Sequence, residues 1–388
     1  MPIATRMEGI APFHVMELMA KAQALEAAGR DIVHMEVGEP DFPTADPILD
    51  AARRFLEGGH VHYTGALGIP PLREAIAGFY ATRYGVDVDP ARIIVTAGAS
   101  GALMLALGAL VSPGDEWLLA DPGYPCNRHF IRFCEGVPRP LAVDAATNFQ
   151  PTAEQVGAGW TAKTRGLLVA SPANPTGTLI SPAELARLWQ AVRMRGGTLI
   201  VDEIYHGLTY GCDAHTALEL SEEIIVINSF SKYFGMTGWR LGWLVVPPHH
   251  VRDVEKLAQN LYIAPSTPAQ YAALAAFAPE TLGILETRRA EFAARRDLLL
   301  PGLRQLGFTV AAEPRGAFYV YADIGDLAAD SQQLAEQLVV EAGVAATPGL
   351  DFGDNAPARH MRFAYTVAAE RLAQGLERMA AFFAHQKK

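Results

Sequence analysis

A lysine lies within a run of small and apolar residues in the second half of the chain. Lys232 is preceded by Ser229 and Ser231 and is followed, eight residues later, by Arg240. Lysine prefers water, so a lysine in such surroundings usually has a lowered pKa and can act as a nucleophile or a base. Ser229 and Arg240 could both reach an anion beside it. A buried structural lysine is the alternative, which this density of Gly and Ser disfavours.

A second place for chemistry is the turn that follows residues 92–96. Ala99 and Ser100 come directly after Gly98 and open a predicted helix. Small residues let a backbone approach an anion closely, and a helix N-terminus offers free N–H groups and the positive end of its dipole. The turn is neither GxGxxG nor a Walker loop, which argues against dinucleotide and nucleoside triphosphate sites. An ordinary tight turn is the alternative.

Polar side chains also follow three other apolar runs. Tyr124 could stack on a planar ring, and Asn174 could present its amide from a rigid loop that contains two prolines. Asp202 directly follows the apolar run at residues 198–201, which we expect to be a buried strand, and Tyr205 comes three residues later. A carboxylate at such a place is costly unless a cation or several donors accompany it. The structural alternatives are a surface-turn aromatic for Tyr124, an Asx turn for Asn174, and an ion pair or helix cap for Asp202.

The elements that position these residues are short apolar runs that alternate with helical patterns. Strands that are apolar on both faces are typical of a largely parallel sheet covered by helices. Ligands bind at the carboxyl ends of such strands. We therefore predict an α/β fold with a mostly parallel central sheet and helices on both of its faces. The predicted strands cover residues 92–96, 116–120, 166–170, 198–201, 224–227 and 241–246.

One helix between these strands has a clear start. Ser181 is a predicted N-cap and Pro182 occupies the first helical position. Glu184 follows at the spacing of a capping box, in which the Ser and Glu side chains each bond the other residue's backbone N–H.

The pattern changes near residue 281 and predicts a smaller α+β domain. A long charged helix over residues 281–300 leads out of the sheet. Strand-like runs at 308–310 and 317–321, a helix near 331–341 and a closing helix over 368–384 follow it. A helix over about residues 15–28 is expected to pack against this domain. We therefore predict an N-terminal segment at 1–45, a large domain at 46–280 and a small domain at 281–388.

Composition narrows the class of protein. Half of the 388 residues are hydrophobic and 19% are charged, which allows a sizeable core and excludes wholesale disorder. The net charge is -10 and no basic run is present, so no nucleic-acid partner is expected. Three cysteines without zinc spacing predict neither a disulfide framework nor a metal site. With no spanning segment or signal pattern, we expect a cytoplasmic protein without a membrane partner.

At these residues the sequence resembles the pyridoxal-phosphate-dependent class I/II aminotransferases of the aspartate aminotransferase superfamily, which have fold type I. Residues 229–242 match the lysine signature of that family throughout. The similarity spans nearly the whole chain. Other matching segments are the glycine loop at 37–42, the tyrosine segment at 62–74, small-domain loops at 314–319 and 348–353, and the arginine segment at 360–363.

The resemblance implies that pyridoxal 5'-phosphate is the cofactor. Lys232 would form the Schiff base and shuttle a proton at the substrate Cα. Asp202 would pair with the pyridine nitrogen of the cofactor and keep it protonated. Tyr205 and Asn174 would bond the phenolic oxygen of the ring, and Tyr124 would stack on the ring.

The resemblance also implies a set of phosphate ligands. Backbone N–H groups of Ala99 and Ser100, the Ser100 hydroxyl, Ser229 and Arg240 would hold the phosphate. Ala99 has no side-chain donor, so it can contribute only its backbone. Tyr63 would reach the phosphate from the neighbouring subunit, which implies a homodimer with active sites at the subunit interface.

On the substrate side, Arg362 would bind the α-carboxylate through two parallel hydrogen bonds, with Gly38 and Asn174 nearby. No second arginine can be assigned to a side-chain carboxylate. Arg128 is a candidate, and a solvated loop arginine is the alternative that we prefer. Phe13, Tyr63 and Tyr124 hint at neutral or aromatic substrates, although core packing accounts for aromatic residues equally well.

The function that the resemblance implies is transfer of the amino group of an α-amino acid to a 2-oxo acid by a ping-pong mechanism. Another reaction on the same scaffold is the alternative: a β-lyase, a decarboxylase or an aminocyclopropane-carboxylate-type lyase. A non-enzymatic effector domain of a transcription regulator would need an appended DNA-binding module, for which we expect no residues.

Overall fold

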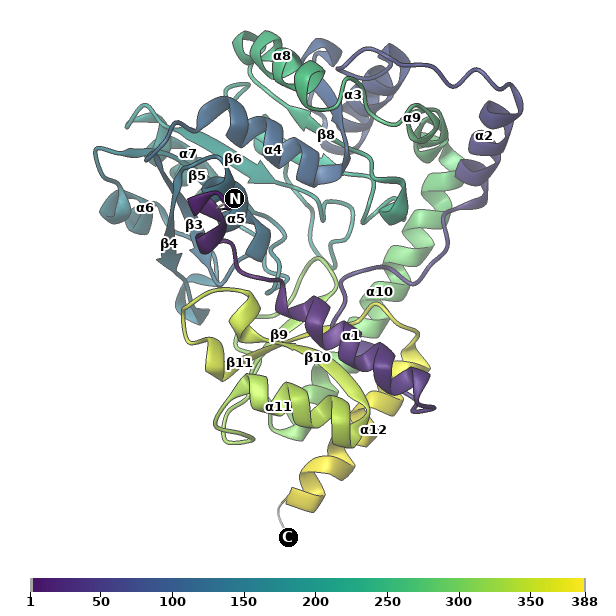
Figure 1. Ribbon diagram of the computed structural model, residues 1–388, viewed down its shortest axis with the longest axis vertical. Helices are drawn as coiled ribbons and strands as arrows, with labels where there is room; N and C mark the ends of the chain where they lie inside the picture. The colour runs from purple at the N-terminus through teal and green to yellow at the C-terminus, as the bar shows by residue number, and fades with distance from the viewer. Residues whose placement is uncertain (1–2, 387–388) are drawn as a thin grey trace.

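The fold is built on two β-sheets joined by a long helix (Figure 1). A computed structural model describes residues 3–386. Residues 1, 2, 387 and 388, which end the predicted terminal segments, lie outside this part. Helix α10 (Pro279–Leu306) runs from the larger sheet to the smaller one, and its start lies close to the predicted boundary near residue 281. The three-part division of the chain stays a prediction.

The larger sheet has seven strands in the order β2-β8-β7-β6-β5-β3-β4. The pairs β3–β4, β3–β5, β5–β6 and β6–β7 are parallel, whereas β8 is antiparallel to both of its neighbours. The predicted mostly parallel sheet is therefore confirmed. Its strands are β2 (Ile93–Thr96), β3 (Glu116–Asp121), β4 (Val137–Ala142), β5 (Thr164–Ala170), β6 (Thr198–Asp202), β7 (Ile225–Ser229) and β8 (Gly242–Val245).

Strand β4 was not predicted from the sequence. It lies at the edge of the sheet, is partly exposed along its length, and contains Pro138 and Pro140. Proline lacks a backbone N–H and is tolerated in a sheet mainly at an edge, so this segment has no apolar signature.

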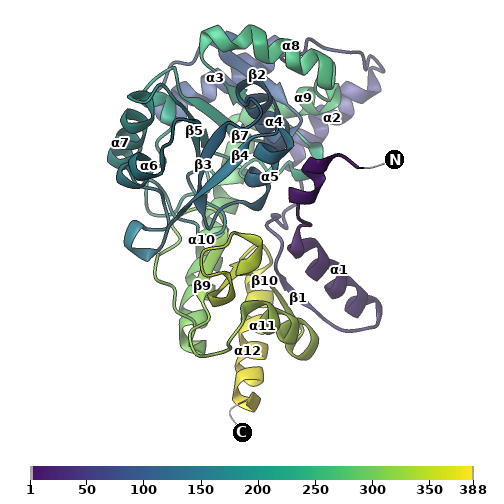
Figure 2. The same cartoon turned by 60° about the vertical axis from the view of Figure 1, so that its left-hand side comes forward.

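Helices cover both faces of the larger sheet, as predicted (Figure 2). Successive residues of β6 show why: Leu199 and Val201 pack into one apolar core, and Ile200 packs into another. Helix α4 (Gly98–Leu110) and α8 (Val251–Leu261) complete the core around Ile200. The other helices of this part are α2 (Asp46–Glu57), α3 (Pro70–Tyr84), α5 (Pro125–Phe133), α6 (Ala153–Gly159), α7 (Pro182–Arg193) and α9 (Thr267–Leu274).

The smaller sheet has four strands in the order β1-β10-β11-β9. Strand β1 pairs in parallel with β10, and the other pairs are antiparallel. Helix α1 (His14–Ala27) packs on this sheet beside β10, as expected for the N-terminal helix (Figure 1). The remaining elements are β1 (Val33–Met35), β9 (Tyr319–Asp323), β10 (Val344–Pro348), β11 (His360–Ala364), α11 (Ser331–Gln337) and α12 (Ala369–Gln386).

Two local predictions were wrong. Residues 308–310 form only an isolated bridge, between Thr309 and Asp323 at the end of the edge strand β9, instead of a strand. The capping box at Ser181 is half formed: the Ser181 hydroxyl accepts the Glu184 N–H at 3.2 Å, as predicted. The Glu184 carboxylate, however, accepts the Ala153 N–H at 2.7 Å, because the N-terminus of α6 lies beside α7 and offers a free donor.

Within residues 3–386, no helix is long and apolar enough to cross a membrane. The same residues contain no group of three or more His, Cys, Asp or Glu side chains that could hold a metal ion.

Candidate functional site

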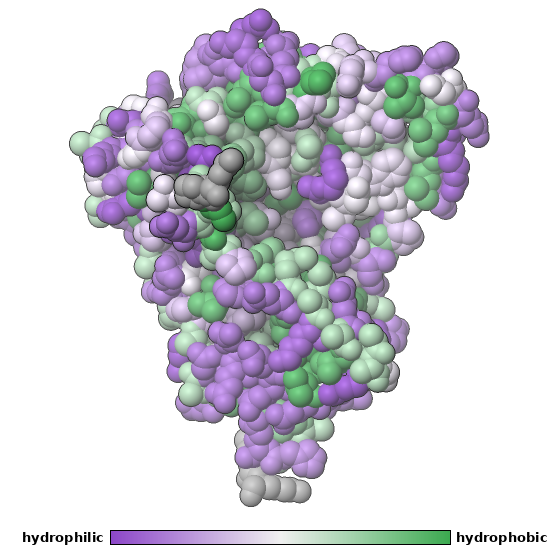
Figure 3. All heavy atoms as spheres, in the orientation of Figure 1, coloured by the Kyte–Doolittle hydropathy of each residue, from purple (hydrophilic) through white to green (hydrophobic). Residues whose placement is uncertain are grey.

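A cavity of about 280 Å³ lies where the carboxyl ends of the large-sheet strands meet the small sheet and α1. Figure 3 shows this face of the molecule hollowed between its two parts. The cavity brings together residues that are far apart in the sequence. Ten of the twelve predicted site residues line it: Gly38, Ala99, Ser100, Tyr124, Asn174, Asp202, Tyr205, Lys232, Arg240 and Arg362.

Lys232 lies just beyond the carboxyl end of β7 and points into this cavity. Its Nζ donates a hydrogen bond to the Gly38 carbonyl oxygen at 2.6 Å. The pKa of Lys232 is lowered to about 8, mainly by burial and also by the cations Arg362 and Arg240, against the opposing charges of Glu39 and Asp202. A substantial fraction of this amine is therefore unprotonated slightly above neutral pH, as a nucleophile or general base requires.

Asp202 ends β6, and its side chain is 4% exposed. The backbone N–H of Ile204 donates to its Oδ1 at 3.0 Å, and no other described residue gives the carboxylate a hydrogen bond. Burial raises the pKa of Asp202 to about 7. A buried carboxylate with one protein donor favours a ligand that brings it an N–H group or a positive charge.

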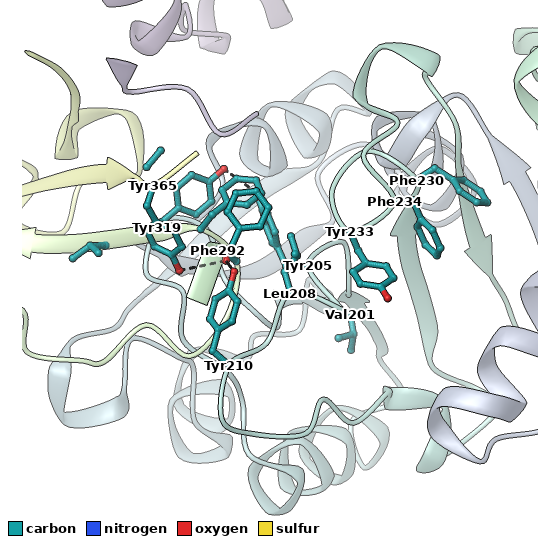
Figure 4. Packing of buried hydrophobic residues seen from close by; sticks show 14 of the residues in the cluster. Val201, Tyr205, Leu208, Tyr210, Phe230, Tyr233, Phe234, Phe292, Tyr319 and Tyr365 are labelled. Carbon is teal, nitrogen blue, oxygen red and sulfur yellow. Dashed lines mark hydrogen bonds between the residues drawn. The ribbon is translucent and has the colours of Figure 1, made fainter. Parts of the chain in front are cut away.

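Two tyrosines meet at this cavity, Tyr205 from the turn after β6 and Tyr319 from β9 of the smaller sheet. The hydroxyls of Tyr205 and Tyr319 lie 2.9 Å apart, and both rings are buried among aromatic residues (Figure 4). A Cβ at Gly38 would lie 1.7 Å from the Tyr319 hydroxyl, so only glycine fits there. Tyr319 was not predicted as a site residue. The apolar pattern of residues 317–321 indicated a strand there but not which of its side chains faces the cavity.

The N-terminus of α4 forms a cradle with Arg240. Gly98 has φ +71°, and a Cβ there would lie 2.6 Å from Arg240 Nη2. Gly242 is equally constrained, since its Cβ would lie 3.0 Å from the Ala99 nitrogen. The two glycines therefore let a guanidinium and free helix N–H groups approach one another, and this geometry suits a bound oxyanion.

Ser229 lies one layer behind the cavity wall rather than in it. Its hydroxyl oxygen lies within hydrogen-bond distance of Ser231 Oγ, at 3.0 Å, and of the Leu241 carbonyl oxygen, at 3.1 Å, and it accepts the Ser231 N–H at 3.1 Å. Ser231 lines the cavity and accepts a hydrogen bond from Arg240 Nη1 at 3.4 Å. Of these two serines, Ser231 is thus the one that contacts Arg240 of the cradle, and the sequence analysis did not single it out as a site residue. A role for Ser229 as an anion ligand stays a prediction.

Arg362 lies on β11 and is 3% exposed. Its Nη1 donates to Asn174 Oδ1 at 2.9 Å, and Nη2 donates to the Thr347 hydroxyl at 3.2 Å and to the Glu36 carbonyl oxygen. The guanidinium carbon lies 4.4 Å from the centre of the Tyr319 ring. Its Nε has no partner among the described residues. This rigidly held guanidinium with a free N–H is suited to binding a carboxylate.

Two predicted candidates lie outside the cavity. Tyr63 is 82% exposed and does not line the cavity of its own chain. Arg128 donates a hydrogen bond to the Asp351 carbonyl oxygen and lines a separate depression, so it does not serve as a second cation in the cavity.

The arrangement combines four chemical abilities in one enclosed space. It offers an oxyanion cradle, a buried carboxylate, a lysine amine with a lowered pKa, and a guanidinium that can bind a carboxylate. Together these groups fit a ligand that carries an anionic group, a protonatable ring and an electrophilic carbon, alongside a second ligand with a carboxylate.

Comparisons with known proteins agree with this description. The family model for aminotransferase class I and II matches residues 30–379. The valine–pyruvate aminotransferase of Mycobacterium tuberculosis is 40% identical over 382 residues, which is 97% of this chain and 98% of that protein.

Solved structures agree as well. An aminotransferase from Mycobacterium tuberculosis superposes with a TM-score of 0.96 at 38% identity, covering 100% of both chains. Aspartate aminotransferase from Thermus thermophilus, solved with maleate, gives a TM-score of 0.93 at 35% identity, covering 98% of this chain and 99% of that one.

Proposed function

The chain belongs to the class I and II aminotransferases, and from this membership we propose that pyridoxal 5'-phosphate binds in the cavity around Lys232. The enzyme catalyses amino-group transfer, which confirms the expected reaction class. With the cofactor bound, it moves the amino group of an α-amino acid to a 2-oxo acid. As the sparse cysteines indicate, we expect it to act in the cytoplasm.

The residues of the cavity fit this cofactor. The Gly98 turn, Arg240 and Ser231 form a cradle that a Cβ at residue 98 would obstruct, and that has room for a phosphate. Asp202 supplies the buried carboxylate for the ring nitrogen. The Lys232 amine supplies the attachment point for an aldehyde.

When bound, the cofactor supplies a carbonyl carbon that accepts the amino group and a ring that withdraws electrons from the substrate Cα. The Lys232 Nζ would take the proton from the substrate Cα and give it to the cofactor carbon that bears the amino group, which its lowered pKa makes possible near neutral pH. Asp202 holds a proton on the ring nitrogen. Tyr205, Asn174 and Tyr124 orient the ring.

The observation that carries the proposal is that Lys232, Asp202 and Arg362 line a single cavity. A screen of amino acids for half-transamination, followed by the absorbance of the cofactor, tests it. We expect amino acids with an α-carboxylate to convert the cofactor to its amino form with release of a 2-oxo acid. Release of carbon dioxide or of a side-chain fragment instead would indicate one of the other cofactor reactions.

Arg362 is expected to recognise the α-carboxylate. In Arg362→Lys, the planar pair of donors is lost, and amino-acid binding should weaken by roughly 2–4 kcal/mol while cofactor binding is retained. KM for the amino acid and the affinity for the cofactor are the measurements.

Arg359→Lys is the matched control for this experiment. Arg359 is an exposed arginine beside the same strand, and it pairs with Asp323 at 2.9 Å instead of facing the cavity. The control should keep the wild-type KM. An equal loss of binding in Arg362→Lys for amines that lack a carboxylate would contradict the assignment.

We also propose a homodimer in which Tyr63 serves the neighbouring subunit's phosphate site. The Tyr63 side chain is exposed although the segment around it is anchored. Thr267 donates to the His62 carbonyl oxygen at 2.7 Å, and Gln270 donates to the Thr64 hydroxyl at 3.1 Å. This outward ring on a fixed backbone, together with the resemblance of residues 62–74 to the tyrosine segment of the family, supports a contact with a second chain.

Complementation is expected to reveal shared sites. A Lys232→Ala chain and a Tyr63→Ala chain are unfolded and refolded together, and activity is compared with that of each chain alone. With random pairing about half of the dimers are mixed, so roughly a quarter of all sites regain wild-type Lys232 and Tyr63 together.

The matched control combines Lys232→Ala with Asp202→Asn. Both of these residues belong to the same chain's cavity, so no mixed dimer contains an intact site and mixing should restore nothing. If confirmed mixed dimers of the first pair are also inactive, Tyr63 does not act across the interface.

A further inference from the structure

One wall of the cavity is apolar and comes from the start of α1. Phe13, Val15 and Met16 all line the cavity from this segment, which we call the α1 wall. Val15 is 5% exposed and Met16 is 50% exposed, so the wall extends from the buried interior to the mouth. An apolar wall favours an apolar side chain on the substrate, because burial removes both surfaces from water.

The charged residues that line the cavity also favour a substrate with an uncharged side chain. Its three cations each have a use in the proposed reaction: Lys232 holds the cofactor, Arg240 its phosphate and Arg362 the α-carboxylate. The remaining charged residues among the lining side chains are all acidic: Asp202, which is assigned to the ring nitrogen, and Glu36 and Glu39. Within residues 3–386 the lining therefore provides no further cation for a side-chain carboxylate. Burying a carboxylate without a partner costs far more than burying a methylene gains.

The α1 wall is held in place from the opposite end of the sequence. Helix α1 has no cap from its own N-cap residue, Phe13. Instead, Asp351 accepts the His14 N–H on Oδ1 and the Val15 N–H on Oδ2, each at 2.8 Å, and is itself 2% exposed. A carboxylate at a helix N-terminus is stabilised by the free N–H groups and the dipole.

The same loop also supports the carboxylate anchor. Phe352 follows Asp351 directly, and its ring lies 4.9 Å from the Arg362 guanidinium carbon. The distance between the α1 wall and Arg362 is therefore set by two adjacent residues.

We propose that the α1 wall selects substrates with uncharged, apolar side chains and that Asp351 is the positioning residue that holds this wall. The inference rests on the proposed function and names its substrate class. Because the two half-reactions use the same cavity in turn, the class covers both the amino acid and the 2-oxo acid.

The first test is the wild-type holoenzyme with alanine, valine and aspartate as amino donors and pyruvate as acceptor. We expect kcat/KM for valine to exceed that for aspartate by at least about tenfold, because aspartate would bury its side-chain carboxylate beside the α1 wall without a partner cation. Alanine, which scarcely reaches the wall, separates the two proposals. If no amino acid, alanine included, is transaminated, the proposed function fails. If alanine reacts and aspartate is preferred to valine, only the selectivity inference is overturned.

The second test adds the missing cation. Met16→Arg should raise kcat/KM for aspartate relative to valine by about tenfold or more, because the new guanidinium can pair with the side-chain carboxylate. Met194→Arg is the matched control, since Met194 is 77% exposed and lies outside the cavity. An equal change in both variants, or no change in Met16→Arg, would count against the α1 wall.

The third test separates positioning from simple destabilisation. Asp351→Asn keeps the shape but loses one acceptor, so KM for valine should rise severalfold while the kcat/KM for alanine changes little. Asp330→Asn is the control: Asp330 also accepts two backbone N–H groups, from Gln332 and Gln333, at the start of α11 and outside the cavity. If Asp351→Asn lowers alanine and valine turnover equally, Asp351 is structural only and the positioning role is wrong.

Discussion

Replacement of Lys232 by alanine is expected to reduce transamination by several powers of ten, on the order of 6 kcal/mol or more in the activation barrier. The structure gives the physical reason: among residues 3–386, Lys232 supplies the one lysine amine in the cavity lining, and its lowered pKa suits proton transfer near neutral pH. The variant should still fold and still bind the cofactor through the cradle at Gly98 and Arg240. Single-turnover kinetics and the absorbance of the bound cofactor measure the two effects separately.

Borohydride reduction followed by peptide mapping tests the same residue without relying on activity. In the wild-type holoenzyme the label should appear on Lys232, and in Lys232→Ala it should be lost. Lys163→Ala is the matched control, because Lys163 is exposed and lies away from the cavity. A label on any lysine other than 232 would overturn the assignment.

Replacement of Asp202 by asparagine is expected to have the next largest effect. The substitution keeps the shape of the side chain but removes the negative charge that holds a proton on the ring nitrogen. If the pKa of that nitrogen falls by about three units, the electronic assistance to proton abstraction falls by about 4 kcal/mol. The rate of proton abstraction from Cα, measured with an α-deuterated amino acid, should drop accordingly and show a larger isotope effect.

Glu203→Gln is the matched control for Asp202→Asn. Glu203 is the next residue and is fully buried as well, but it accepts hydrogen bonds from Thr216 at 3.0 Å and from the Ala217 N–H at 2.7 Å rather than lining the cavity. Its variant should keep a near wild-type isotope effect. Near wild-type turnover of Asp202→Asn with the cofactor bound would show that the carboxylate does not act on the ring nitrogen.

The pH dependence of stability provides an independent check on Asp202. In the protein without cofactor, burial raises the pKa of Asp202 from 3.8 to about 7, so between these pH values the folded chain holds a proton that the unfolded chain has lost. Its contribution to stability therefore falls as the pH rises through this window. Asp202→Asn lacks this titration, so its free energy of unfolding should depend less on pH there than that of the wild type.

The sequence by itself determined six of the seven strands of the larger sheet and the polar residues at its carboxyl edge. A buried parallel strand is recognisable in the sequence as a short run of apolar residues. The polar residue that follows each run lies at the carboxyl edge of the sheet. This is why Asp202 and Lys232 could be placed from β6 and β7 alone. The family resemblance then added Arg362 and the chemical role of each predicted site residue. The edge strand β4 contains two prolines and no apolar run, so it was not predicted.

Only the tertiary structure decided which distant side chains complete the site. Tyr205 and Tyr319 are 114 positions apart, and His14 and Asp351 are 337 positions apart, yet both pairs are in hydrogen-bond contact. The periodicity of apolar residues indicates that a residue is buried, but it does not indicate against which other residue it packs. That partner is set by how the two sheets and α1 pack together, so the places of Tyr319, Ser231, Val15 and Met16 in the cavity became known only from the tertiary structure.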